Sequence, residues 1–210
     1  MQMKTAGSTG HGRAGALPGR LSVTGIDPAQ QPTDRLFFAI FPDAAATARI
    51  AQLAQRLRAE HSLHGHPLKT ERFHVTLHHL GDHVGLRHDI VAAASEAAAT
   101  IAMPPFELAF DRVMSFDSRP RIRPLVLRGG DGLAALTRFR QSLGTAMAKA
   151  GLGRWVETSY TPHVTLLYDD RPVAGQPVET IAWTARKFVL VRSLLGQTLH
   201  VPLARWPLRG

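Results

Sequence analysis

The chain has 210 residues, and its 25 lysines and arginines against 16 acidic residues leave a formal net charge of +9. This length suits one compact domain or two small lobes. The chain has no cysteine, which excludes disulfides and thiolate metal sites, and no apolar stretch long enough to span a membrane. We therefore predict a cytoplasmic protein. Its charge would attract polyanions such as RNA, although an arginine- and alanine-rich composition alone explains that charge equally well.

Residues 1–33 are rich in Gly, Ser, Thr, Pro and Gln and predict a flexible N-terminal segment. Residues 34–210 then form a single predicted domain, with Asp43 as a helix N-cap and Gly81 closing a strand. In chain order the predicted elements are a strand (36–41), a helix (44–59), a strand (73–80), a helix (86–101), strands (106–110 and 125–127), a helix between Asp131 and Gly151, and strands (162–168, 180–183, 187–193 and 199–205). This order predicts an α+β fold with mainly antiparallel strands in two similar halves.

The tetrapeptide His-Val-Thr-Leu occurs twice, at residues 74–77 and 163–166, and each copy lies in a predicted strand. By composition, chance would give a repeat that begins with His in roughly one such sequence in fifty. A second regularity supports a true repeat, because Leu36 and Leu125 each open an apolar run and each lie 38 residues before the histidine of one copy. The sequence therefore predicts a duplicated unit of strand, helix and histidine-bearing strand.

Alternate side chains of a strand share a face, so His74 and Thr76 point one way, and His163 and Thr165 repeat this arrangement. If the halves pack about a pseudo-twofold axis with these faces opposed, one cavity receives two imidazoles and two hydroxyls. Imidazole titrates near pH ~6.5 and can act as acid or base, and a hydroxyl can donate to a phosphoryl oxygen. This set of groups suits attack on a phosphodiester without a metal.

These features resemble the two-histidine phosphoesterase superfamily, in its branch of bacterial RNA 2',3'-cyclic phosphodiesterases, also called 2'-5' RNA ligases. The resemblance covers residues 35–210. It rests on the opening Arg-Leu-Phe-Phe-Ala-Ile with Pro42, on both His-Val-Thr-Leu copies, on the Leu-Gly that follows the first copy, and on the closing Trp-Pro-Leu at 206–208. It implies a bilobal fold in which each lobe contributes one copy to a central cleft.

The resemblance also implies roles for the residues of the two copies. His74 and His163 would be the catalytic acid/base pair, and Thr76 and Thr165 would bind the substrate phosphate. By similarity to family members that leave a 2'-phosphate, His163 would activate water and His74 would protonate the departing 3'-oxygen. The reverse reaction, 2'-5' RNA ligation, would exchange these roles.

Three further residues are candidate substrate contacts. By strand alternation His78 shares the cavity face with His74 whereas His79 faces the core, so His78 either contacts substrate or is a partly exposed residue at the rim. Tyr160, in the loop before the second copy, could contact a base. Arg171 could replace a basic residue that many relatives carry soon after the second copy.

Eight of the eleven histidines lie between His61 and His88, which raises the alternative of a metal site. Useful sites also need converging geometry and usually carboxylates or thiolates, and this stretch shows no such ligand pattern. We predict no metal and no cofactor.

The sequence thus predicts a monomeric enzyme that hydrolyses 2',3'-cyclic phosphodiesters at RNA or nucleotide ends and has no membrane partner. Two alternatives stay open. One is an RNA-end-binding module without turnover, although binding alone has no need of paired proton-transfer groups. The other is a phosphodiesterase that acts on a small cyclic nucleotide and never on RNA.

Overall fold

The computed structural model describes residues 31–117 and 122–210, so the predicted flexible segment 1–33 lies outside the described residues except for its last three positions. In the described part, eight strands form one antiparallel sheet in the order β6-β3-β4-β5-β2-β1-β7-β8. The strands are β1 (Asp34–Ile40), β2 (Val75–His83), β3 (Phe106–Ser115), β4 (Arg123–Arg128), β5 (His163–Asp169), β6 (Gln176–Ala185), β7 (Lys187–Leu194) and β8 (Leu199–Pro207). The α-helices are α1 (Ala44–Glu60), α2 (His88–Ala99) and α3 (Ala134–Met147). The predicted α+β fold is confirmed.

Local sequence explains where these elements begin and end. The Asp43 carboxylate accepts the N–H of Ala46 at 2.8 Å and caps α1, as predicted. The prediction that Gly81 closes β2 is wrong, because the strand continues to His83. Gly81 has φ +97°, which glycine adopts without the clash that a Cβ would cause. No helix in the described part of the chain is long and apolar enough to cross a membrane.

The sheet consists of two half-sheets that meet at one pair of residues. Strands β6-β3-β4-β5 form one half and β2-β1-β7-β8 the other, and the register of β2 with β5 consists of Val75 opposite Val164. These two residues are equivalent positions of the His-Val-Thr-Leu repeat. Antiparallel pairing of equivalent residues places a local twofold axis between them, so the predicted duplication is confirmed in the order β1-α1-β2 and β4-α3-β5.

Both copies carry a β-bulge at their leucine. Ala39 and Phe38 of β1 face Thr76 and His78, which leaves Leu77 as the extra residue of β2. Val126 and Leu125 of β4 face Thr165 and Leu167, which leaves Leu166 as the extra residue of β5. A bulge interrupts the period-two alternation of side chains, so residues after it point to the opposite face from the one that simple alternation predicts.

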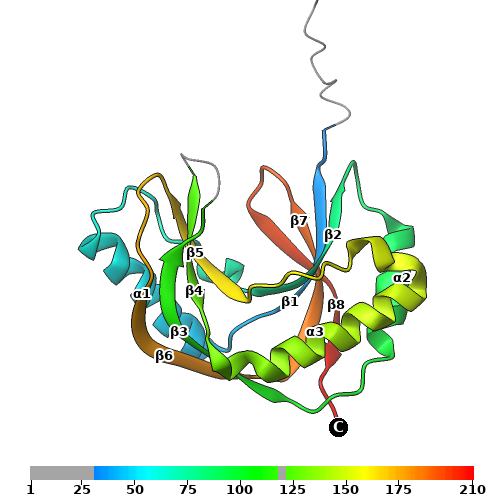
Figure 1. The fold of residues 1–210 in the computed structure, drawn as a ribbon. Helices are drawn as coiled ribbons and strands as arrows, with labels where there is room; N and C mark the ends of the chain where they lie inside the picture. Colours follow the sequence, from blue (N-terminus) through cyan, green and yellow to red (C-terminus); the bar gives the residue numbers. More distant parts are fainter. Residues whose placement is uncertain (1–30, 118–121) are drawn as a thin grey trace, which may run out of the picture. The chain divides into compact units, whose positions relative to one another are not determined.

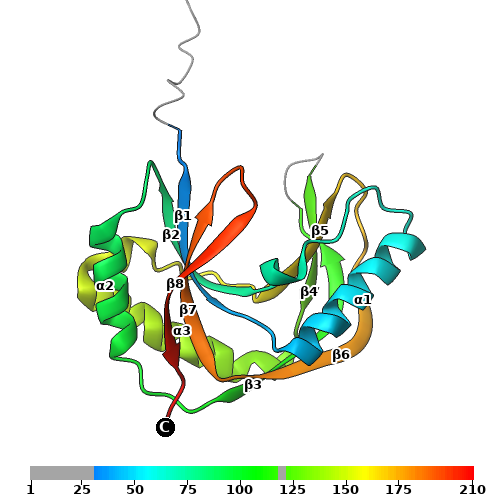
Figure 2. The same ribbon diagram turned by 180° about the vertical axis from the view of Figure 1, so that it is seen from behind.

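The two connecting helices tie the half-sheets together. Helix α1 follows β1 but packs against β5 and β6, and α3 follows β4 but packs against β2 and α2 as well as β3. Figure 1 and its reverse view, Figure 2, show α1 beside β4–β6 and α2 beside β1 and β2. Each half of the duplication therefore lends a helix to the strands of the other half.

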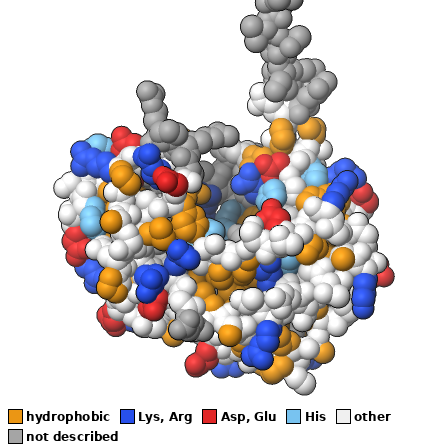
Figure 3. Space-filling model, in the orientation of Figure 1, with side chains coloured by type: hydrophobic (Ala, Val, Ile, Leu, Met, Phe, Trp, Pro, Cys, Tyr) orange, Lys and Arg blue, Asp and Glu red, His pale blue; other side chains and the backbone are white. Residues whose placement is uncertain are grey.

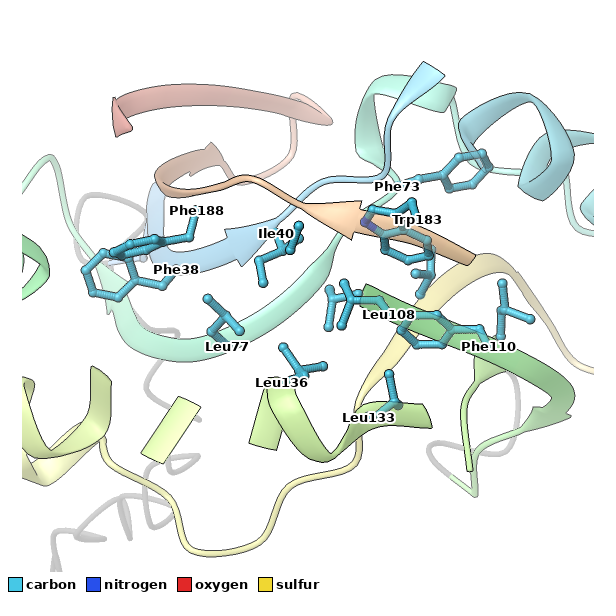
Figure 4. Close-up of a cluster of buried hydrophobic side chains, with 14 of the residues drawn as sticks. Phe38, Ile40, Phe73, Leu77, Leu108, Phe110, Leu133, Leu136, Trp183 and Phe188 are labelled. Carbon is cyan, nitrogen blue, oxygen red and sulfur yellow. The ribbon is translucent and has the colours of Figure 1, made fainter. Parts of the chain in front are cut away.

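One apolar core runs beneath both half-sheets. In Figure 4, Phe38 and Phe188 lie at one end of the cluster and Phe110 and Trp183 at the other, with Leu136 of α3 between them. Phe110 and Trp183 stack with their ring centroids 5.0 Å apart. Continuous burial of this kind predicts that the two halves unfold together.

Phe139 of α3 tests this continuity, because its ring lies 5.5 Å from that of Phe106 in one half and 5.1 Å from that of Phe188 in the other. Phe139→Ala should lower the free energy of unfolding by about 3–5 kcal/mol, and Phe139→Leu by less than about 1.5 kcal/mol. Urea unfolding followed by circular dichroism and by tryptophan fluorescence measures this. Both signals should change in one coincident transition, and two separated transitions would show that the halves are independent.

Candidate active site

A cleft opens where the half-sheets meet, and both His-Val-Thr-Leu copies lie in its floor. His74, Thr76, His163 and Thr165 all line it. Figure 3 shows the surface hollowed here, with histidine and cationic side chains at and inside the rim. Further side chains that line the cleft are Arg35, Phe37, Arg72, His79, Tyr168 and His200.

The four repeat side chains share one face of neighbouring strands. We expected the two faces to oppose each other across a cavity. Because Val75 lies opposite Val164, antiparallel geometry instead sets His74 beside Thr165 and Thr76 beside His163 on the same side of one sheet. Each histidine therefore has a hydroxyl from the other copy as its neighbour.

The tautomer of both catalytic candidates follows from backbone hydrogen bonds. Nδ1–H of His74 donates to the Arg72 carbonyl at 2.7 Å, and Nδ1–H of His163 donates to the Thr161 carbonyl at 2.8 Å. A carbonyl only accepts, so in the neutral rings the proton is on Nδ1 and Nε2 keeps its lone pair. Both Nε2 atoms are thus available in the cleft to take up or deliver a proton.

Aromatic side chains pack against both imidazoles, which are half-buried in the cleft. The His74 ring lies 5.0 Å from Phe37, 5.9 Å from Phe41 and 5.2 Å from His200. The pKa of His74 is lowered from 6.5 to about 4, chiefly by burial. The charges of His200, His163 and Arg72 contribute to the fall, and the hydrogen bond to the Arg72 carbonyl opposes it. Burial also lowers the pKa of His163, whose ring meets Phe116 edge-on at 4.9 Å.

The hydroxyls of Thr76 and Thr165 make no hydrogen bond to any residue that the structure describes. Both side chains are partly exposed in the cleft. They can therefore donate to an oxygen of a bound phosphate, which is the role predicted for them.

His78 does not lie in this cleft, so the prediction that it shares a face with His74 is wrong. Its side chain is 2% exposed, and its Nε2–H donates to the Arg140 carbonyl at 3.0 Å. The bulge at Leu77 turns His78 into the core and brings His79 to the cleft instead.

The other two candidate contacts support the backbone around the site. The Tyr160 hydroxyl donates to the Thr76 carbonyl at 3.0 Å, and burial raises the pKa of Tyr160 above its usual value. Tyr160 does not line the cleft between the histidines, although it lines a neighbouring hollow. Arg171 lies outside both, where its guanidinium donates to the Ser62 carbonyl at 2.7 Å.

Sequence patterns did not single out Arg140 of α3, which supports the first bulge. The Arg140 side chain is buried, donates through Nε to the Leu77 carbonyl at 2.9 Å and through a terminal nitrogen to the Glu157 carbonyl at 2.8 Å, and lies 4.2 Å from the centre of the Tyr160 ring. With Tyr160 it satisfies two successive carbonyls, of Thr76 and Leu77. A buried arginine on the inward face of a helix was the available signal, since such a cation needs partners.

Among the described residues, one group could hold a cation. Ligand atoms of His64, Asp169 and Asp170 lie within 4.8 Å of one another at the end of β5, and none of these residues lines the cleft. The Asp169 carboxylate already accepts the backbone N–H groups of Gly65 at 2.6 Å and Arg171 at 2.8 Å. These bonds tie the loop after α1 to β5.

Comparison with known proteins identifies the fold. The chain is similar to Escherichia coli LigT complexed with 3'-AMP, with 27% identity over 86% of this chain and 100% of that one and a TM-score of 0.64. It is similar to a phosphoesterase of known crystal structure, with 27% identity over 85% and 100% of the two chains and a TM-score of 0.65. TT0787 of Thermus thermophilus, at 20% identity over 84% and 98% and a TM-score of 0.66, shares the fold. No curated protein matches the chain.

The sequence model of the 2'-5' RNA ligase superfamily matches residues 41–197 of this chain, which include both His-Val-Thr-Leu copies. The match spans most of the chain and agrees with the paired histidines of the cleft. The protein belongs to the 2'-5' RNA ligase superfamily, and thus to the two-histidine phosphoesterases that its sequence resembles.

Proposed function

We propose that the cleft hydrolyses 2',3'-cyclic phosphodiesters at RNA or nucleotide ends and leaves a 2'-phosphate. The observation that carries this proposal is the position of two imidazoles on one face of the sheet, each with Nδ1–H donated to a carbonyl and Nε2 available in the cleft. Proton transfer at two oxygens of one phosphodiester needs such a pair. With the threonine hydroxyls as phosphate donors, we propose that the reaction needs no metal.

In this reaction His163 takes a proton from water while the water oxygen forms a bond to phosphorus. The bond from phosphorus to the 3'-oxygen breaks, and His74 gives its proton to that oxygen. The Thr76 and Thr165 hydroxyls donate to the non-bridging oxygens, where they stabilise charge in the transition state. In 2'-5' ligation the 5'-hydroxyl of a second RNA takes the place of water: it gives its proton to His163 as its oxygen bonds to phosphorus, and the 3'-oxygen leaves with the proton of His74. In the reverse step the 3'-hydroxyl attacks the 2'-5' linkage and releases the 5'-hydroxyl, and the two histidines exchange roles.

The cleft favours an anionic substrate. Arginine and histidine side chains line it, and none of the described residues that line it carries a carboxylate. Among relatives, LigT has been crystallised with 3'-AMP and with phosphate, which share the phosphate group that we place between the histidines. Both histidines come from one chain, so we propose that a monomer is active, and the absence of cysteine fits our proposal of a cytoplasmic enzyme.

Replacement of either histidine tests the proposal. His74→Asn and His163→Asn should each lower kcat by about 10²–10⁴-fold, because each removes one proton transfer. Thr76→Val and Thr165→Val should each cost about tenfold in kcat/KM, because each removes one hydrogen bond to a charged group. The assay is hydrolysis of a 2',3'-cyclic nucleotide, with chelator present and the product identified by phosphorus NMR.

His88→Asn is the matched control, because His88 is an exposed residue at the start of α2. It should retain full activity. Full turnover by His74→Asn and His163→Asn would remove the proposed function. Turnover that is lost in the presence of chelator would remove the proposal that no metal is needed.

The pH dependence follows from the burial of both imidazoles. The reactive form has one neutral and one protonated ring, and kcat/KM reports the free protein, in which burial lowers both pKa values below 6.5 and that of His74 to about 4. Thus kcat/KM should be greatest below pH 6.5 and fall as the pH rises further. The bound phosphate anion raises both pKa values, so kcat should peak at a higher pH than kcat/KM. A maximum of kcat/KM at or above pH 7 would contradict this account.

A further inference from the structure

Two side chains that line the cleft, the cationic Arg72 and the ionisable His200, have no part in the reaction above. Arg72 ends the 3-10 turn Thr70–Arg72 just before β2, and His200 lies near the start of β8. Both line the cleft together with His74. Arg72 lies two residues before His74 in the sequence, and the sheet brings the distant His200 to the same place.

His200 lies against the first catalytic candidate. Its ring centroid is 5.2 Å from that of His74 in an edge-on arrangement and 5.5 Å from that of Phe37. Nδ1 of His200 is enclosed by protein and has no hydrogen-bond partner among the described residues. An enclosed N–H without a partner costs more than an enclosed lone pair, so the proton of the neutral ring belongs on Nε2. Nε2 is not enclosed in this way and can donate to a ligand.

The guanidinium of Arg72 also makes no hydrogen bond or ion pair with the residues that the structure describes. Nε of Arg72 is enclosed without a hydrogen bond, and none of the ion pairs found in the described part of the chain involves this residue. Arg35, the other arginine that lines the cleft, differs because Asp82 holds it through two oxygens, both at 2.7 Å. An arginine with an enclosed nitrogen and no counter-ion is costly in the free protein, and a bound anion would remove that cost.

The charge of Arg72 reaches both neighbouring imidazoles. Burial lowers the pKa of His200 to about 4, with the positive charge of Arg72 as the next cause, and the same charge lowers the pKa of His74. Arg72, His200 and His74 line the same cleft, so an anion bound there can contact Arg72 and His200 while another occupies the site at His74. Arginine offers a planar set of donors that matches phosphate oxygens.

We propose that Arg72 and His200 form a second phosphate-binding subsite beside His74, which takes the phosphate on the 5' side of the terminal nucleoside. This inference rests on the proposed function. It deepens that function by naming the substrate class. The preferred substrate is a cyclic phosphate end that also carries a phosphate on its 5' side, and not a cyclic mononucleotide with a free 5'-hydroxyl. An anion here would also offset the charge that disfavours protonated His74, and so would help His74 to act as the acid.

Three substrates of the intact protein test the subsite. These are a nucleoside 2',3'-cyclic phosphate with a free 5'-hydroxyl, the same compound with a 5'-phosphate, and a dinucleotide that ends in a 2',3'-cyclic phosphate. We expect kcat/KM to be at least about tenfold higher when a second phosphate is present, as one hydrogen bond between charged groups provides. A gain with the 5'-phosphate only, or with the dinucleotide only, assigns the subsite to a phosphomonoester or to an internucleotide phosphate.

The variants Arg72→Gln and His200→Gln should each reduce the gain in kcat/KM from the second phosphate to less than about threefold. The kcat/KM of the compound with a free 5'-hydroxyl should change least. Arg56→Gln is the matched control, since Arg56 is an exposed arginine on α1 whose neighbour Glu60 lies 3.6 Å away. This variant loses one positive charge outside the cleft, as Arg72→Gln does inside it, and should keep the full gain in kcat/KM from the second phosphate. Circular dichroism establishes that each variant is folded.

The proposal is overturned if the second phosphate gives no gain in the unaltered protein, or if the gain survives both substitutions. It is also overturned if both variants slow all three substrates equally, because the two residues would then act on the cyclic phosphate itself. If no substrate is hydrolysed, the proposed function fails. The affinities of the same three compounds, measured by calorimetry, then test the subsite. Compounds with a second phosphate should bind at least about tenfold more tightly than the compound with a free 5'-hydroxyl, and equal affinities would overturn the subsite.

Discussion

The register of β2 against β5 is the constraint on which the site depends. Val75 lies opposite Val164, and this pairing of equivalent residues sets both His-x-Thr faces on one side of one sheet. A slip of one residue in either strand would turn its histidine and threonine to the opposite face. The crossed packing of α1 and α3, and the core shared beneath both half-sheets, hold this register in place. The fold thus specifies the chemistry through a single strand pairing.

Within this symmetric frame the two imidazoles have different surroundings. Both donate Nδ1–H to the carbonyl two residues earlier. His74 then packs among Phe37, Phe41 and His200, whereas His163 meets Phe116 near the charge of Arg128, and only for His74 is the fall in pKa large. Duplication supplies two imidazoles with the same backbone hydrogen bond. Residues outside the two His-Val-Thr-Leu copies give the imidazoles different surroundings and different pKa values. In the free protein the lower pKa of His74 opposes its proposed role as the acid, and a bound phosphate anion would offset this effect.

The sequence predicts most elements and the four repeat side chains, because their signals are local. It misplaces His78, since alternation does not detect a bulge. Continuing the repeat comparison would have shown the error, because His78-His79 aligns with Leu167-Tyr168, and Leu167 is apolar and buried whereas Tyr168 lines the cleft. Arg72 and His200 belong to no pattern. Arg72 lies two residues before His74, whereas only the long-range pairing of strands brings His200 beside His74. Arg171, chosen for its place in the sequence, lies outside the cleft.

The central claim is that both histidines act on one phosphate. A crystal structure of the protein with a nucleoside 2'-phosphate, the proposed product, tests it most directly. The account predicts phosphate oxygens within about 2.7–3.2 Å of Nε2 of both His74 and His163, with the Thr76 and Thr165 hydroxyls donating to the same phosphate. A product phosphate that contacts only one of the two imidazoles, or that binds away from this cleft, would contradict it.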